Sequence, residues 1–289
     1  MATVFTLADS IRSSGLEWAL LEGIADQNLL VASAFSEGEP GRGVLSPKVT
    51  GKSTEGGILV SGSKRPCSIA RSMDLLSASA VITDEDGAHR TVVLLLPANS
   101  PGISVHPFWR SNVLAGAESD EVRLNDVFVD EKLILPVTSE ADGSLDELQT
   151  TGFIWFEMMI ASCYLGMATA LVSQAIKRPG IGKQRIAEMG IRLETAAMLL
   201  DSIAHLILDG ETGNAALARA TIARYGAEDA IVDVANYAVR ALGGMSFISS
   251  SDVAYLAAAC QCLQFHPPSR IAGDSAVCAG LVGESFVIR

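Results

Sequence analysis

Positive charge is scarce in this chain, and the shortage limits its partners. Its 289 residues include 21 Lys and Arg against 33 Asp and Glu, which gives a formal net charge of −12. Proteins that bind the phosphate backbone of a nucleic acid, or an acidic membrane surface, usually carry an excess of Lys and Arg. We therefore expect no nucleic-acid partner, and an anionic ligand would need a local cluster of basic residues.

Regularly spaced cysteines are also lacking. The chain has five cysteines without CxxC spacing, namely Cys67, Cys163, Cys260, Cys262 and Cys278. A disulfide framework or a zinc site requires cysteines at characteristic spacings, so we expect neither. The segment Met1–Ile11 lacks the basic start and apolar stretch of a secretion signal. A reducing cytoplasm is therefore the expected location.

Long hydrophobic runs are rare, and the run that raises a membrane question is residues 152–176. This segment is almost wholly apolar and long enough to span a bilayer. It also contains Glu157 and many small residues, and no strong basic flank precedes it. We favour a helix buried on all sides, at the centre of a bundle or a subunit interface, over a membrane span. No membrane insertion is then expected.

Residues 54–137 have the pattern of a β-domain. Apolar or alternating runs, separated by Gly, Pro and Asp, occur at residues 56–64, 74–82, 91–97 and 121–129. Asp84-Glu85-Asp86-Gly87 is typical of a hairpin turn. No helix of useful length fits between these runs, so we expect an antiparallel meander or a small barrel.

Helical sequence flanks the β-domain. Residues 6–27 have helical spacing of apolar residues, and Leu29–Phe35 follows as a buried strand before a glycine-rich loop. After a polar linker at residues 139–146, we predict helices at about 148–177, 183–209, 212–242, 250–263 and from about 268. The expected domains are a short helical lead (1–30), the β-domain (31–140) and a helical bundle (141–289).

Several motifs, taken in order and spacing, resemble those of the acyl-CoA dehydrogenase family. They are Gly62-Ser63-Lys64, Pro101 to Val105, Ser119 to Val129, and Ala241-Leu242-Gly243-Gly244-Met245. The resemblance covers nearly the whole chain. It implies an α+β fold in which an antiparallel β-barrel-like domain precedes a C-terminal four-helix-type bundle. Residues 1–30 would represent only the last part of the family's N-terminal helical domain.

The resemblance also implies FAD, bound between the β-domain of one subunit and the helical domain of its neighbours in a homo-oligomer. The family's reaction is α,β-dehydrogenation of an acyl thioester, carried by CoA or by a carrier protein. Ser36 and Ser68 fall where the family has hydroxyl residues that hydrogen-bond the flavin. Arg178 matches the arginine that reaches the FAD phosphates, and Gly243 and Gly244 match the glycine pair that meets the pyrophosphate.

The family's catalytic base is not matched. Its Y-E-G-T glutamate falls on Pro267, and the alternative glutamate of an E-R pair falls on Phe156, with Glu157 at the arginine position. Pro66-Cys67 also replaces a tryptophan beside the flavin. Glu157 and His266 are the candidate replacements for the base. A buried structural carboxylate and a polar loop residue are the alternative interpretations of these two positions.

Three functions follow from this mixture of matches and departures. The first is an FAD-dependent oxidoreductase of acyl thioesters with Glu157 as base. The second is a catalytically silent partner or scaffold subunit of a flavoprotein complex, in which another protein supplies the missing helical domain. The third is a re-purposed flavin oxygenase, since relatives of this fold bind reduced flavin and oxygen. Fold alone cannot choose among them.

Overall fold

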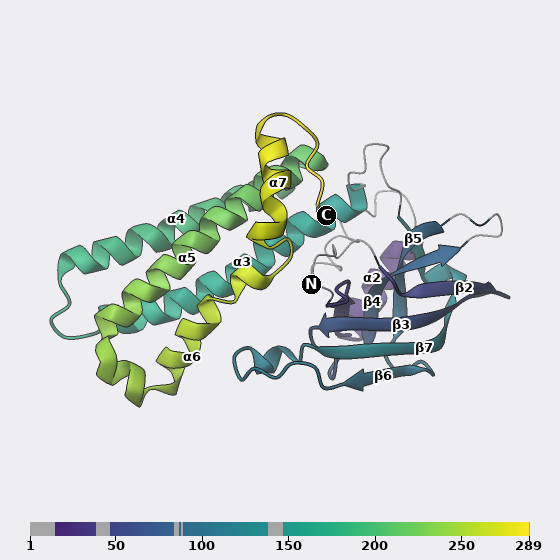
Figure 1. The fold of residues 1–289 in the computed structure, drawn as a ribbon, viewed down its shortest axis with the longest axis horizontal. Helices are drawn as coiled ribbons and strands as arrows, with labels where there is room; N and C mark the ends of the chain where they lie inside the picture. Colours follow the sequence, from purple (N-terminus) through teal and green to yellow (C-terminus); the bar gives the residue numbers. More distant parts are fainter. Residues whose placement is uncertain (1–14, 39–46, 84–86, 88, 138–146, 289) are drawn as a thin grey trace. The chain divides into compact units, whose positions relative to one another are not determined.

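The computed structural model describes residues 15–38, 47–83, 87, 89–137 and 147–288, and it divides into two compact units (Figure 1). The unit that ends at Gln149 is called the β unit below, and Thr150–Ile288 is called the helical unit. The predicted polar linker and residues 39–46 of the glycine-rich loop lie outside the described residues.

The β unit is one mixed sheet preceded by helix α2 (Gly15–Asp26). Its strands are β1 (Val31–Ala34), β2 (Thr50–Thr54), β3 (Gly57–Cys67), β4 (Leu75–Thr83), β5 (His89–Pro97), β6 (Ile103–His106), β7 (Asp120–Asp130) and β8 (Ile134–Pro136). The strand order is β6-β7-β3-β2-β4-β5-β8, with β1 paired to β4. The four predicted strand runs correspond to β3, β4, β5 and β7, with bounds that differ by up to three residues.

The predicted meander or barrel was wrong in its pairing. Strands β1 and β2 both run parallel to β4, where Val31 lies opposite Leu75 and Thr50 lies opposite Val81. Together they share one edge of β4, and the described strands do not close into a barrel. Since the remaining pairs are antiparallel, the sheet is mixed. The α+β class is confirmed.

The core of the β unit centres on β4, which is covered on both faces. Leu76, Ala78 and Ala80 are fully buried, and Ser77 and Ser79, which point to the opposite face, are buried as well. Apolar side chains of β3, β5 and β7 complete the same core. Because both faces of β4 are buried, its sequence is a nearly continuous run of apolar and small hydroxyl residues.

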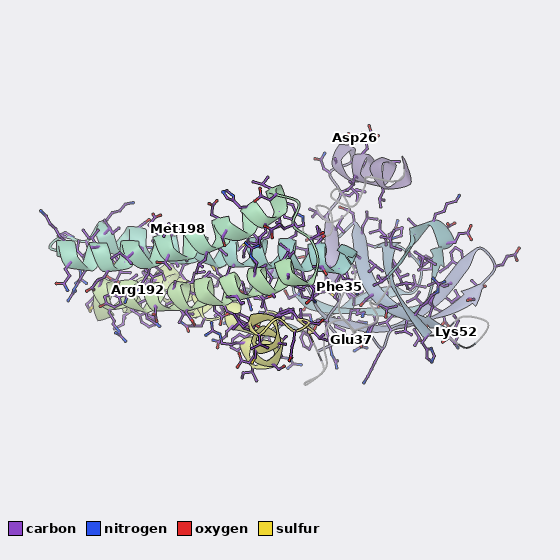
Figure 2. The ribbon with its side chains drawn as sticks, turned by 90° about the horizontal axis from the view of Figure 1, so that it is seen from above. Asp26, Phe35, Glu37, Lys52, Arg192 and Met198 are labelled. Atoms are coloured by element: carbon purple, nitrogen blue, oxygen red, sulfur yellow. The ribbon has the colours of Figure 1, made fainter. Side chains whose placement is uncertain are left out.

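The helical unit consists of long helices joined by short turns. They are α3 (Glu147–Ile176), α4 (Lys183–Leu208), α5 (Asn214–Ser249), α6 (Ser251–Cys260) and α7 (Arg270–Leu281). Helices α4 and α5 lie side by side, and Figure 2 shows Arg192 and Met198 on α4. The predicted end of the third helix at residue 242 coincides with a break in α5. The backbone leaves helical geometry at Gly243, where φ is 78° and ψ is 168°, and a second helical stretch follows to Ser249.

Helix α3 is buried along one face within this chain, which does not fit the centre of a bundle, and burial at a subunit interface stays a prediction. Ile154, Tyr164 and Leu171 lie on the buried face, whereas Ser162 and Thr169 are exposed. Over Gln149–Ile176 the length and composition of α3 would allow it to cross a membrane, and 33% of its most apolar window is buried in the chain. Ser162 and Thr169 each donate a hydrogen bond to a carbonyl one turn earlier in the helix.

Candidate functional site

Ser36 and Ser68, the predicted flavin-ring contacts, lie on neighbouring segments of the β unit. Ser36 follows β1 and Ser68 follows β3, and the backbone N–H of Arg65 donates to the carbonyl of Ser36 at 2.8 Å. The hydroxyls of Ser68 and Ser119 are 3.2 Å apart. Ser68 is exposed and Ser36 is half-buried. Both hydroxyls therefore belong to one end of the sheet, as the resemblance requires.

A buried ion pair lies beneath this end of the sheet. Lys64 Nζ is fully buried and lies 2.7 Å from Glu37 Oε1 and 3.0 Å from Ser79 Oγ. Glu37, labelled with Phe35 in Figure 2, also accepts from the backbone N–H groups of Lys48 and Val49. Burial alone would raise the pKa of Glu37, but the Lys64 and backbone hydrogen bonds lower it below its usual value. This carboxylate is therefore charged and fully engaged.

A cavity of about 200 Å³ opens beside the pair. Its lining residues are Glu37, Lys48, Val49, Gly62, Ser63, Arg65 and Glu121. Glu121 accepts hydrogen bonds from Arg123 and Ser63, and these bonds lower its pKa to about 2. Both carboxylates of the cavity are thus ionised and already paired at neutral pH. Among the described lining residues, neither carboxylate is suited to taking a proton from a substrate.

Arg178 and Gly243, predicted to meet the flavin phosphates, lie together in the helical unit. The Arg178 guanidinium donates to the carbonyls of Ala241 and Leu242, next to the bend at Gly243. A Cβ added at Gly243 would lie 3.0 Å from Arg178 Nη1, and one at Gly244 would meet nothing within 4 Å. A cation beside an open diglycine bend is a suitable environment for a pyrophosphate. These residues fit a flavin dinucleotide.

Glu157, a candidate base, is sealed inside the helical unit. Its side chain is fully buried, and Glu157 Oε2 lies 3.3 Å from Arg224 Nε, which is also fully buried. Neither carboxylate oxygen accepts a hydrogen bond from the described part of the chain. Burial raises the pKa of Glu157 to about 8, with Arg224 acting to lower it and Glu228 to raise it. A base must reach the proton that it removes, and this carboxyl is enclosed.

His266, the second candidate, lies at the turn between α6 and α7. Its Nε2 is 2.8 Å from the hydroxyl of Tyr164, and the ring also packs against Phe156. Burial, with a smaller effect of Arg224, lowers the pKa of His266 to about 4. The imidazole is therefore neutral at neutral pH. It is half-buried, so it is more accessible than Glu157.

Arg224 connects the two candidates, and the sequence analysis missed it. Besides its contact with Glu157, its guanidinium donates to the carbonyl of His266 at 3.2 Å. One feature of the sequence pointed to a missing arginine, because the resemblance expects an arginine at the position of Glu157. In the structure the guanidinium of Arg224, from α5, lies beside Glu157. Arg224 and Glu228, four residues apart, look like an ordinary surface pair in the sequence.

Comparison with known proteins agrees with this architecture. The model of the acyl-CoA dehydrogenase C-terminal domain matches residues 149–266. Isobutylamine N-hydroxylase of Streptomyces viridifaciens is 43% identical over 270 residues, which are 93% of this chain and 71% of that protein.

Two solved structures share the fold at low identity. A glutaryl-coenzyme A dehydrogenase in complex with glutaryl-CoA has a TM-score of 0.79 at 21% identity, covering 100% of this chain and 74% of that one. FMN-bound TdsC of Paenibacillus sp. A11-2, a dibenzothiophene monooxygenase, has a TM-score of 0.80 at 17% identity, covering 99% and 78%. The motifs, the fold and the 43% identical relative together show that the chain belongs to the acyl-CoA dehydrogenase family.

Proposed function

We propose that this chain is a flavin-dependent monooxygenase that N-hydroxylates a small primary amine. The observation that carries the proposal is the 43% identity, along 93% of the chain, with an isobutylamine N-hydroxylase. The proposal selects the oxygenase among the three functions that the sequence left open.

The base positions support an oxygenase over a dehydrogenase. Acyl-thioester dehydrogenation requires a base that removes the α-proton, and the two family positions hold Phe156 and Pro267. The candidate carboxyl, Glu157, is enclosed and contacts Arg224. Hydroxylation of a neutral amine makes no carbanion, so it does not need that base. We therefore assign Glu157 a supporting role.

The remaining site residues have distinct proposed roles. A reduced flavin, when bound, supplies two electrons, so that the amine and O₂ give the hydroxylamine and water. Ser36 and Ser68 would hydrogen-bond the flavin ring, and Arg178 with Gly243 and Gly244 would bind its phosphates. The neutral imidazole of His266 would accept a hydrogen bond from the amine N–H through Nδ1 and orient the nitrogen.

The test compares two reactions of the purified protein. In the first, isobutylamine is incubated with FAD or FMN, a flavin reductase, NADH and air; in the second, acyl-CoA thioesters are incubated with an electron-accepting dye. The proposal expects an oxygen-dependent hydroxylamine and no enoyl product. An enoyl thioester formed without oxygen would support the dehydrogenase instead, and flavin binding without either product would support the silent subunit.

The proposed assembly is a cytoplasmic homo-oligomer. In the family the ring-binding and phosphate-binding residues come from neighbouring subunits, and this chain holds them in separate units. Light scattering in the presence and absence of flavin measures the association state, and a strictly monomeric, flavin-loaded protein would contradict this assembly.

A further inference from the structure

The turn between α6 and α7 is held from below by two consecutive residues of α5. This turn, Leu263–Ser269, begins with the 3₁₀ helix Leu263–Phe265 and carries His266. Arg224 donates to the carbonyls of Leu263, His266 and Pro268 at 2.7, 3.2 and 2.9 Å. The hydroxyl of Tyr225 donates to the carbonyls of Pro268 and Ser269. Four carbonyls of one short turn are thus bound by one pair of side chains.

The guanidinium of Arg224 is oriented by carboxyl groups as well. Its Nε faces Glu157 Oε2 at 3.3 Å, and Nη2 lies 3.7 Å from Glu228 Oε2. The two Nη groups are the donors that reach the turn. Because the planar fork of an arginine cannot rotate its donors independently, a carboxyl beside Nε directs the Nη groups at the turn. Glu157 thus lies beside the guanidinium whose other two nitrogens bind the turn.

The position of the His266 imidazole depends on the turn as well as on helix α3. The His266 ring contacts Tyr164 and Phe156 of α3, whereas its backbone carbonyl is bound by Arg224 of α5. The ring is thus fixed from two helices, and release of the turn would free its backbone while the ring contacts remained. Small displacements of a substrate-orienting group cost large factors in rate.

We propose that Arg224 is a positioning residue, which holds the Leu263–Ser269 turn and through it the His266 imidazole where the substrate amine binds. The part of this role that concerns the amine rests on the proposed function. Glu157 and Glu228 serve to orient Arg224. A guanidinium that merely stabilised the bundle would affect unfolding but would not specifically alter the turn or the turnover of folded protein.

The test variant is Arg224→Lys, and Arg192→Lys is its matched control. Lysine keeps the charge but presents one ammonium, which cannot reach three separated carbonyls at once. Arg192 lies on α4, where its guanidinium stacks on Tyr237 and donates to the Glu188 carbonyl, outside the turn. Hydrogen–deuterium exchange is measured on peptides that cover residues 263–273. We expect exchange about tenfold faster in Arg224→Lys and unchanged in Arg192→Lys.

Kinetics of the flavin-loaded protein give the second readout. In Arg224→Lys we expect the turnover of isobutylamine to fall by about 100-fold, with the flavin dissociation constant unchanged. Should this variant fail to fold, Tyr225→Phe removes two bonds to the turn, and a smaller change in the same directions is expected.

Unchanged exchange in the turn of the folded variants would overturn the inference whatever the activity. Full turnover with a loosened turn would overturn the positioning role. A wild-type protein that hydroxylates no amine contradicts the proposed function instead, because the exchange experiment still reports on the turn.

Discussion

The β unit and the helical unit each hold a glutamate beside a buried cation, yet the two pairs are built in opposite ways. Glu37 accepts hydrogen bonds from Lys64 Nζ and from two backbone N–H groups. Glu157 lies near Arg224 but accepts no hydrogen bond from the described residues. Accordingly, the pKa of Glu37 lies below its usual value and that of Glu157 is raised to about 8.

The difference shows what each pair does. A carboxylate that accepts hydrogen bonds from several donors fixes the segments that carry those donors. Glu37 joins the loop after β1 to β3 in this way. A buried carboxyl without hydrogen bonds costs stability. We expect this cost at Glu157 to be offset by its contribution to the orientation of Arg224 beneath the turn that carries His266. We therefore regard the satisfied pair as structural, and we propose that the unsatisfied pair supports the site.

The largest effect is expected from Arg224→Met. This change leaves three turn carbonyls and two carboxyls without their shared partner, and loss of one member of a buried pair costs about 3–5 kcal/mol. Urea unfolding measures the loss. A loss of unfolding free energy below about 1 kcal/mol would mean that the helical unit rearranges to satisfy the groups around Arg224. The two ion pairs would then no longer differ in the way described above.

Lys64→Met should cost somewhat less, about 2–3 kcal/mol, because Glu37 keeps its backbone hydrogen bonds and is partly exposed. The double variant Glu37→Gln with Lys64→Met serves as the reference for a neutral pair. Double-mutant cycles for the two pairs should give the larger coupling energy to Glu37 and Lys64. A larger coupling between Glu157 and Arg224 would reverse our ranking.

The pH dependence of stability should differ in sign of slope between the two glutamates. Because the folded-state pKa of Glu157 is raised, its contribution is fully present below about pH 4.5 and is lost as pH rises toward about 8. The melting temperature of the wild type should therefore fall relative to Glu157→Gln between pH 6 and 9, by about 2–4 °C per kcal/mol.

Glu37→Gln provides the control for that experiment. The pKa of Glu37 is lowered, so its contribution is constant above about pH 4.5 and is lost only under acid. The melting-temperature difference between wild type and this variant should be flat from pH 6 to 9. If the melting temperatures of both variants depended on pH in the same way relative to the wild type, this would contradict the raised pKa of Glu157.

The smallest effects come from hydroxyl deletions. Ser79→Ala removes the hydroxyl that accepts a hydrogen bond from buried Lys64 Nζ at 3.0 Å, and it should cost about 1–2 kcal/mol. Thr221 Oγ1, buried on α5, has no hydrogen-bond partner among the described residues, so Thr221→Val should be neutral or slightly stabilising. Equal losses in the two variants would show that the helical unit satisfies its polar groups as fully as the β unit does.

The sequence predicted the elements better than their pairing. The runs that became β3, β4, β5 and β7 are periodic, so their bounds were close. The parallel pairing of β1 and β2 with β4 depends on contacts between distant segments, and local pattern does not contain it. The break in α5 at Gly243 was predictable because glycine adopts positive φ readily, whereas the helical stretch from there to Ser249 was not predicted.

In the candidate site, the sequence identified the unusual carboxyl, Glu157, but not the arginine that lies beside it, Arg224. Glu157 was recognisable as a lone charge in an apolar helix. Arg224 was not, since nothing in α5 distinguishes a guanidinium under a turn from one in solvent. The resemblance gave Arg178 and Gly243 a shared role from two separate motifs, and in the structure the Arg178 guanidinium lies beside the Gly243 bend.

The central claim is that this family member inserts oxygen into an amine, and isotope labelling tests it most directly. Isobutylamine is incubated with the protein, a flavin, a flavin reductase and NADH under ¹⁸O₂, and the mass of the product is measured by mass spectrometry. We predict a hydroxylamine that carries one ¹⁸O atom. An unlabelled amine, together with an acyl thioester that the same preparation desaturates without O₂, would contradict the claim.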